Sequence, residues 1–233
     1  MPRIPIIEDL TSGPIPPGSG FLVEYDPASH WYNASLTISA GYLKTGGIVD
    51  YNATAQTLPS IRSKLGRFGL DVETLEREGK LELNDWYTAT LGKKSNEKYA
   101  YNSLKVADLS IDFSKTELGD PSRPARLVIR DNMSTLARFN DEKAWVEFEV
   151  TRPVQVTKQH KSVVFRGVVK GVHSEWVYKR LEDSCDGIID FKLDESTDPP
   201  RNLMRIRSMR DVGFDGRWHQ IKVSENFEVT FEK

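Results

Sequence analysis

The sequence predicts an α/β protein with a mostly parallel β-sheet, and three observations lead to this fold class. Short apolar runs alternate along the chain with segments whose apolar residues recur at helical spacing, as in a parallel sheet flanked by helices on both faces. The C-terminal part instead carries three short alternating runs, which favour antiparallel strands. The 233 residues are 38 % hydrophobic and 28 % charged, the balance of a soluble globular protein. We therefore expect a single domain over residues 1–233.

The first predicted strand follows an irregular N-terminal segment. Residues 1–20 are rich in Pro and Gly from Thr11 onward and predict a loop that leads into the sheet. The apolar run Phe21–Val23 predicts a buried strand that ends before a turn at Asp26-Pro27. A helix is expected next, ending at the Gly46-Gly47 pair.

The rest of the chain repeats this order. Strands are predicted at residues 47–51, 81–85, 126–129, 163–169 and 187–191, and helices at 58–68, 104–113 and around 176–181. The runs 203–207, 217–223 and 227–231 predict an antiparallel extension of one sheet edge. Polar composition at 92–102 and 118–124 indicates surface loops. Between 130 and 162 the pattern is mixed and specifies no clear element.

Charge, cysteine count and hydropathy exclude several classes of function. The 32 Lys and Arg against 34 Asp and Glu give a net charge of −2, which gives no whole-molecule attraction for nucleic acid or an anionic membrane. The single cysteine, Cys185, can form neither an internal disulfide nor a zinc cluster. No apolar run is long enough to cross a membrane, and the N-terminus lacks a signal-peptide pattern. We expect a cytoplasmic protein without membrane contact.

The loop after the first strand is where an open parallel sheet usually binds phosphate. The segment Phe21–Ser35 reads FLVEYDPASHWYNAS. A phosphate loop needs G-x-x-x-x-G-K-[ST], because glycines let backbone N–H groups approach the phosphates, the lysine neutralises charge and the hydroxyl holds Mg²⁺. None of these requirements is met here.

This region nevertheless resembles a known family. The order Pro16–Glu24, then Asp26-Pro27 and a helix, resembles the start of the RecA-like core in the KaiC-like family of P-loop ATPases. On that family's pattern, non-glycine residues stand at the three glycine positions, and aromatic residues stand at the lysine and Ser/Thr positions. The altered segment comprises Tyr25, Asp26, Ala28, Ser29, His30, Trp31 and Tyr32.

The resemblance covers most of the chain. Segments 58–71, 84–87, 127–134, 170–175, 185–190 and 205–210 resemble the family in order and spacing. It implies a RecA-like P-loop NTPase core in which Asp131 takes the place of the Mg²⁺-coordinating carboxylate of the Walker B strand. Residues 52–56 lack the family's catalytic glutamates. Arg210 matches an arginine that reaches a neighbouring subunit's nucleotide, whereas Ser208 replaces the lysine.

The altered segment together with Asp131 is therefore predicted to be a vestigial nucleotide site, with no catalytic residue, metal site or cofactor expected. Trp31, Tyr32 and His30 either fill the vacated site as core or stack on a new planar ligand. Asp131 is expected to be a hydrogen-bonded or ion-paired carboxylate, since one carboxylate makes a poor Mg²⁺ site. His173 and His219 predict hydrogen-bonding roles, and Cys185, Trp86 and Trp145 predict burial.

The leading functional hypothesis is a non-catalytic pseudo-ATPase, a regulatory or scaffolding subunit that assembles with itself or with a related ATPase. One alternative is a divergent nucleotide-binding ATPase or sensor rebuilt around His30, Trp31, Tyr32 and Asp131. Another is a RecA-like nucleic-acid-associated protein that uses the basic cluster between Arg201 and Arg217. On a strand, Arg205 and Arg207 share one face. With Arg210 they are the candidate partner contacts, against the simpler alternative of a solvated edge that discourages strand addition.

Overall fold

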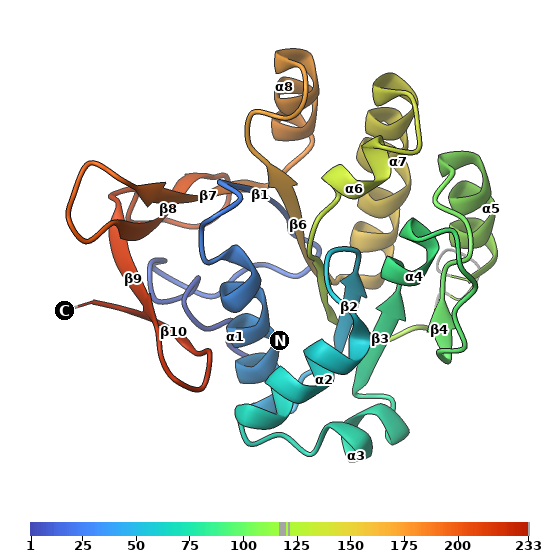
Figure 1. The fold of residues 1–233 in the computed structure, drawn as a ribbon, viewed down its shortest axis with the longest axis horizontal. Coiled ribbons are helices and arrows are strands. Elements are labelled where there is room, and N and C mark those ends of the chain that lie inside the picture. The colour runs from blue at the N-terminus through green and yellow to red at the C-terminus, as the bar shows by residue number, and fades with distance from the viewer. Residues whose placement is uncertain (117–119, 121, 233) are drawn as a thin grey trace.

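A ten-stranded sheet forms the centre of the computed structural model, which describes residues 1–116, 120 and 122–232 (Figure 1). The strands are β1 (Gly20–Tyr25), β2 (Val49–Ala53), β3 (Leu81–Asp85), β4 (Tyr99–Ala100), β5 (Leu127–Arg130), β6 (Val163–Val169), β7 (Gly187–Asp194), β8 (Arg201–Met209), β9 (His219–Val223) and β10 (Val229–Phe231). Their order across the sheet is β10-β9-β8-β7-β1-β6-β5-β2-β3-β4.

Seven strands, from β4 across to β7, run parallel, and β8, β9 and β10 extend one edge antiparallel. This confirms the predicted fold class. Because β1 lies between β6 and β7, and β5 is next to β6, the carboxyl ends of these four strands meet at one edge of the sheet. Ligands bind beyond this edge in open α/β folds.

Helices cover both faces of the sheet (Figure 1). They are α1 (Trp31–Lys44), α2 (Leu58–Arg67), α3 (Val72–Arg77), α4 (Tyr87–Thr90), α5 (Val106–Thr116), α6 (Ser134–Ala137), α7 (Glu142–His160) and α8 (Glu175–Asp183). One core packs α1 and α2 against the sheet, and a second packs α5, α7 and α8 against the opposite face. Strand alternation separates the two cores: Phe21 and Val23 join the first, whereas Leu22 joins the second.

The N-terminal segment is irregular, as predicted, but it packs closely against the rest of the molecule. Ile4, Ile7 and Ile15 are buried in the first core. A Cβ placed on Gly41 of α1 would lie 2.5 Å from Cγ of Pro5, so this glycine lets the segment approach the helix. An isolated bridge joins Thr11 to Phe214. The segment is thus part of the core rather than a loose connection.

Helix α7 is the largest element that the sequence pattern missed. Asp141 caps it by accepting a hydrogen bond from the Ala144 N–H at 3.1 Å. Pro153 lies inside it and offers no N–H to the carbonyl of Glu149 four residues earlier. Nη1 of Arg166 donates to that carbonyl at 3.1 Å instead. Since this tertiary contact replaces the lost bond, the proline does not end the helix.

The predicted loops agree with the structure where it describes them. Residues 92–102 are irregular apart from β4, and residues 118, 119 and 121 of the predicted loop 118–124 lie outside the described residues. Within the described ranges, no helix is both long and apolar enough to cross a membrane. In the same ranges, no three His, Cys, Asp or Glu side chains are grouped so that they could hold a metal ion.

Candidate functional site

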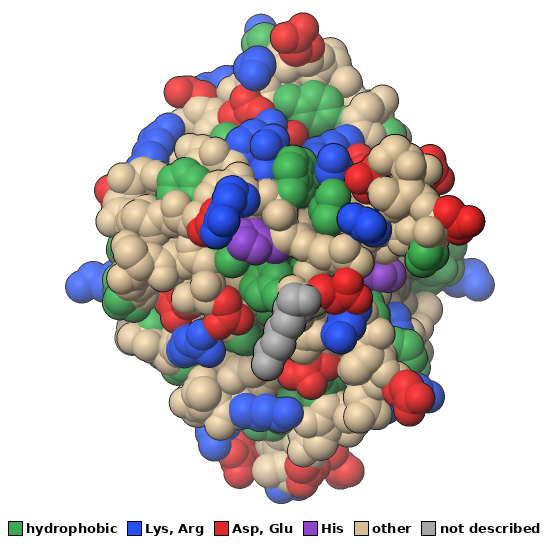
Figure 2. Space-filling model, turned by 90° about the vertical axis from the view of Figure 1, so that its left-hand side faces the viewer, with side chains coloured by type: hydrophobic (Ala, Val, Ile, Leu, Met, Phe, Trp, Pro, Cys, Tyr) green, Lys and Arg blue, Asp and Glu red, His purple; other side chains and the backbone are tan. Residues whose placement is uncertain are grey.

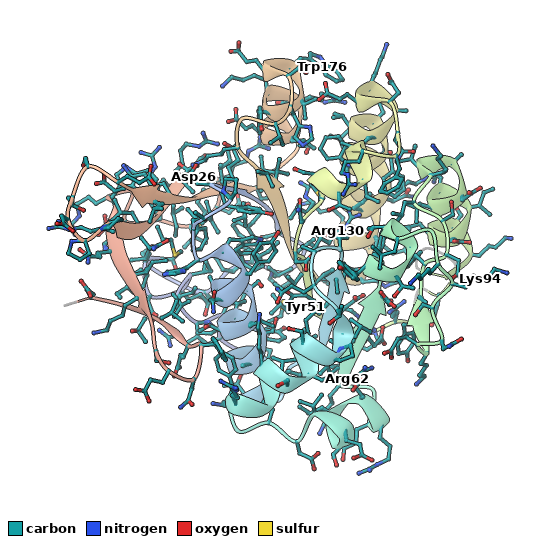
Figure 3. All side chains as sticks on the ribbon, viewed as in Figure 1. Asp26, Tyr51, Arg62, Lys94, Arg130 and Trp176 are labelled. Carbon is teal, nitrogen blue, oxygen red and sulfur yellow. The ribbon has the colours of Figure 1, made fainter. Side chains whose placement is uncertain are left out.

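The loop between β1 and α1 is short and tied to the neighbouring strand. It spans Asp26–His30, where the Asp26 N–H donates to the Phe191 carbonyl at 3.1 Å and the Asp26 carboxylate accepts from the Leu193 N–H at 3.2 Å. Ser29 Oγ donates to the Asp26 carbonyl at 2.7 Å. Ala28 is exposed and His30 half-buried. The loop therefore folds onto itself and onto β7 as a tight turn; Figure 3 labels Asp26 at the end of β1.

Trp31, the first residue of α1, points into the core. Its side chain is completely buried, and its Nε1 donates to the Asp131 carbonyl at 2.7 Å. Its ring lies 5.6 Å from the Phe191 ring and 6.3 Å from the Tyr25 ring. A Cβ on Gly167 of β6 would come within 2.5 Å of Trp31 Nε1. The indole thus fills the space that the missing side chain of Gly167 leaves open.

Tyr25 and Tyr32 lie beside Trp31, and Tyr51 lies on strand β2. The hydroxyls of Tyr25 and Tyr32 are hydrogen-bonded to each other at 2.9 Å, and Tyr51 bonds Ser35 Oγ at 2.9 Å. Burial raises the pKa of Tyr25, Tyr32 and Tyr51 above the usual value of 10.0, so the phenols stay neutral. Figure 3 shows Tyr51 in the interior beside α1. The cluster is aromatic, hydroxyl-rich and uncharged.

Asp131 follows β5 at the same sheet edge and is fully buried. Its Oδ1 accepts hydrogen bonds from the Thr54 N–H at 2.8 Å and from Thr54 Oγ1 at 2.7 Å. Its Oδ2 has no hydrogen-bond partner among the described residues. Burial raises the pKa of this carboxyl from 3.8 to about 6. Asp131 is hydrogen-bonded, as predicted, and the neighbouring Arg130 pairs with Glu149 instead.

The predicted site residues thus come together, except that Ala28 and His30 lie at the rim. Sequence reasoning missed Thr54 and Gly167, which complete the cluster from β2 and β6. Thr54 directly follows β2, three residues beyond the end of the predicted strand 47–51, and its place near a strand end was the available signal. Gly167 lies inside a predicted strand, where an isolated glycine indicates close approach of another group.

The three candidate partner arginines differ in what they contact. Arg205 Nε donates to Asp190 at 2.8 Å, and its guanidinium lies 4.4 Å from the centre of the Trp218 ring. Arg207 Nη2 donates to Glu24 at 2.6 Å and to Glu182 at 2.8 Å. Both arginines contact Asp190, which confirms that they share one face of β8. Arg210 is exposed and donates to the Asp183 carbonyl at 3.0 Å.

Figure 2 shows basic, acidic and apolar side chains intermingled on the face that includes the C-terminal strands. The charges of Arg205 and Arg207 on β8 are offset by Asp190, Glu24 and Glu182. They do not form a continuous basic patch of the kind that binds a nucleic-acid backbone.

The other single residues noted in the sequence behave as expected. Trp86 and Trp145 are completely buried, and Cys185 is buried as well. Cys185 Sγ lies 2.8 Å from Nη2 of Arg166. His173 and His219 form hydrogen bonds or ion pairs with acidic side chains.

The strand order, the β1–α1 loop and the carboxylate after β5 together define a protein with a RecA-like fold. A family model described as "ATPase: KaiC" matches residues 38–232. The chain belongs to the KaiC family of ATPases. The matched stretch begins inside α1, after the altered loop.

Two curated relatives and one solved structure agree with this assignment. UPF0273 proteins of Methanocaldococcus jannaschii and Pyrococcus horikoshii are 25 % and 24 % identical to this chain, and each match covers 98 % of the chain and 92 % of the relative. The crystal structure of a KaiC-like protein from Pyrococcus horikoshii superposes with a TM-score of 0.74 at 16 % identity. That match covers 99 % of this chain and 96 % of the other, and it supports the fold.

Proposed function

We propose that this chain is a pseudo-ATPase of the KaiC family, non-catalytic at the nucleotide site, and a regulatory or scaffolding subunit that acts through protein–protein assembly. The observation that carries the proposal is the position of Trp31. In a phosphate loop this position holds the lysine that neutralises the phosphates, beside glycines that expose backbone N–H groups. Here it holds a buried indole whose only polar atom is bonded to the Asp131 carbonyl.

The surrounding side chains do not fit a Mg²⁺–nucleotide phosphate group either. The Tyr25 and Tyr32 hydroxyls bond each other, and burial keeps the phenols neutral. Asp131 is a single carboxylate, and one carboxylate makes a poor Mg²⁺ site. Oδ1 of Asp131 already accepts a hydrogen bond from Thr54 Oγ1. We infer that the space of the nucleotide phosphates is occupied by this chain's own core.

Arg210 is the best candidate for an assembly contact. It lies just past the end of β8, is exposed, and donates to a backbone carbonyl rather than to a carboxylate. Arg205 and Arg207 are engaged with acidic groups of their own chain. An acidic group on a second subunit would therefore meet less competition at Arg210.

The first test measures nucleotide binding. We expect a fluorescent ATP analogue with Mg²⁺ to give no saturable signal at millimolar concentration, while an ATPase with an intact phosphate loop serves as the positive control. Trp31 fluorescence should likewise not respond to ATP or ADP. A saturable response lost in Trp31→Phe would contradict the proposal and favour the rebuilt nucleotide sensor.

The second test measures assembly. Size-exclusion chromatography with light scattering, on the chain alone and mixed with a catalytically active KaiC-family protein from the same organism, should give a species heavier than the monomer. Arg210→Glu should weaken it. Arg217→Glu is the matched control, because exposed Arg217 already pairs with Asp215 in its own chain. A strict monomer in both samples would contradict a scaffolding role.

A further inference from the structure

A second candidate site lies beside the closed nucleotide position, at the same carboxyl edge of the sheet. It is a cavity of about 400 Å³ lined in part by Asn132, Ser134, Arg138, Glu142 and His173. Its residues come from the segment after β5, from the start of α7 and from the turn after β6. None belongs to the β1–α1 loop; the cavity adjoins the Trp31 cluster at Asn132, whose carbonyl accepts a hydrogen bond from Thr54 Oγ1 at 2.7 Å.

Ser134 and His173 form a direct hydrogen bond in this cavity. Ser134 Oγ lies 2.8 Å from His173 Nε2 and accepts a hydrogen bond from the Val169 N–H at 3.0 Å. With the backbone N–H on one lone pair, the hydroxyl proton is directed to the imidazole and one lone pair remains for attack. This is the nucleophile–base geometry of covalent catalysis.

Other groups fix the orientation of the imidazole. Glu142 Oε1 lies 3.3 Å from His173 Nδ1, and the buried Trp145 ring lies 4.8 Å from the imidazole. Glu142 is itself held by Ser174, whose Oγ donates to Oε2 at 2.9 Å. The hydroxyl of Tyr178 accepts from the Val172 N–H at 3.2 Å and donates to the Val169 carbonyl at 2.7 Å. The turn that carries His173 is therefore fixed on both sides.

We propose that Ser134, His173 and Glu142 form a nucleophile, a general base and a positioning carboxylate that hydrolyse small carboxylic esters in this cavity. Ser134 Oγ forms a bond to the ester carbonyl carbon while its proton passes to His173 Nε2. The bond to the alcohol oxygen breaks, and the leaving alkoxide takes the proton from His173. Water, deprotonated by His173, then attacks the acyl-serine, releases the carboxylic acid and restores Ser134.

The walls indicate the class of ester. Ala137, Val169 and Val172 give the cavity an apolar side, while Asn132 and Arg138 give it hydrogen-bond donors. The Arg138 guanidinium lies 5.6 Å from the centre of the Phe139 ring. A short ester that carries a second, ionised carboxyl group fits these walls, because the guanidinium can bind that carboxylate.

The test uses the intact chain with a fluorophosphonate probe, which reacts with activated serines, followed by peptide mass spectrometry. We expect the adduct on Ser134. An adduct on another serine, or none, would overturn the proposal. This readout needs no variant, so it does not depend on how a substitution affects folding, and it is independent of nucleotide binding and assembly.

Hydrolysis of p-nitrophenyl acetate and p-nitrophenyl hemisuccinate then tests the roles. Ser134→Ala and His173→Gln should each lower the rate by about 100-fold or more. His219→Gln is the matched control, because His219 pairs with Asp215 outside the cavity. Arg138→Gln should slow the hemisuccinate more than the acetate. Equal rates in the Ser134 variant and the native chain would overturn the proposal.

The role of Glu142 is tested by the pH profile. Burial lowers the pKa of His173 and Glu142 raises it, while Arg138 also lines the cavity. Glu142→Gln should therefore reduce the plateau rate and move the acid limb of the profile to lower pH. A merely structural role would reduce the rate and leave that limb in place, which would contradict the assignment of Glu142.

Discussion

Two substitutions of Trp31 separate the contribution of its packing to stability from the contribution of its hydrogen bond. Trp31→Ala removes a completely buried ring and should lower the free energy of unfolding by about 3–5 kcal/mol. Trp31→Phe keeps most of the ring but leaves the Asp131 carbonyl without its donor, a loss of about 1–3 kcal/mol. Urea unfolding measures both. Trp176→Phe, at a residue 46 % exposed on α8 (Figure 3), is the control and should change little.

Asp131 makes a prediction about pH. Its pKa in the folded chain is about 6, above the usual 3.8. The folded state therefore binds the Asp131 proton more tightly than the unfolded chain does. The protonated carboxyl stabilises the folded state fully below pH 3.8, and this contribution to the free energy of unfolding is lost as pH rises through about 6. The two-unit difference corresponds to about 3 kcal/mol.

Asp131→Asn keeps an acceptor for Thr54 and cannot ionise. Relative to the native chain, we expect its free energy of unfolding to rise as pH increases through about 6, measured by urea unfolding across the pH range. A difference that does not change with pH would contradict the assigned pKa.

For single residues, the sequence predicted chemical character and burial better than contacts. The absence of lysine and glycines from the β1–α1 loop, and the burial of Trp86 and Trp145, followed from residue types and pattern. The pairing of Asp131 with Thr54 joins residues 77 positions apart. The same is true of Ser134 with His173, 39 positions apart. No local pattern reports such pairs, because tertiary packing creates them.

Helix α7 gives the sharpest prediction at the scale of elements. Its Glu149 is completely buried and pairs with Arg130 of β5, while Glu149 Oε1 has no hydrogen-bond partner among the described residues. Glu149→Ala would leave the buried guanidinium without its carboxylate and should cost about 3–5 kcal/mol of stability. The double variant Arg130→Met, Glu149→Leu should recover most of it. Chemical unfolding of the single and double variants measures the coupling.

Glu147→Ala on the same helix is the matched control, because its pair with Arg180 is exposed and should contribute at most about 1 kcal/mol. A double variant no more stable than Glu149→Ala would mean that the arginine charge is not the source of the loss.

Element prediction succeeded where one physical pattern dominated. The apolar residues of β6, interrupted by Arg166 and Gly167, predicted its bounds, Val163–Val169, without error. Helix α7 failed because Pro153, Glu149 and other buried polar residues interrupt its apolar period. Strand β4 has two residues, too few to show an alternation.

At the scale of the whole molecule, the N-terminal segment and the C-terminal strands share one core with α1. Ile7 is completely buried in it, together with Ile221 of β9 and Val229 of β10. Ile7→Ala should lower the free energy of unfolding by about 2–5 kcal/mol while keeping one cooperative transition. Thermal unfolding followed by fluorescence and circular dichroism measures this. Met1→Ala, at an exposed side chain, is the control, and separate transitions for the two probes would contradict a shared core.

The fold as a whole was the most predictable level. Alternating strands and helices with a change to antiparallel signals at the C-terminus gave the architecture that the structure shows. Physical reasoning about the sequence supplied no strand order, because pairing partners lie far apart in the chain. The expectation of a RecA-like core came from the resemblance to the family, and the match to the KaiC family model supports that resemblance.

Gly167 has a consequence for how this chain can change over time. The indole of Trp31 lies against Gly167, where any larger residue at position 167 would collide with it. Tyr25 and Asp131 contact that indole. Replacing Trp31 with lysine alone would leave an unfilled space above the glycine and a charge inside an uncharged interior. Conversion to a phosphate-binding loop would thus need several substitutions made together. Because these side chains depend on one another, single substitutions do not lead from this loop to a phosphate-binding loop.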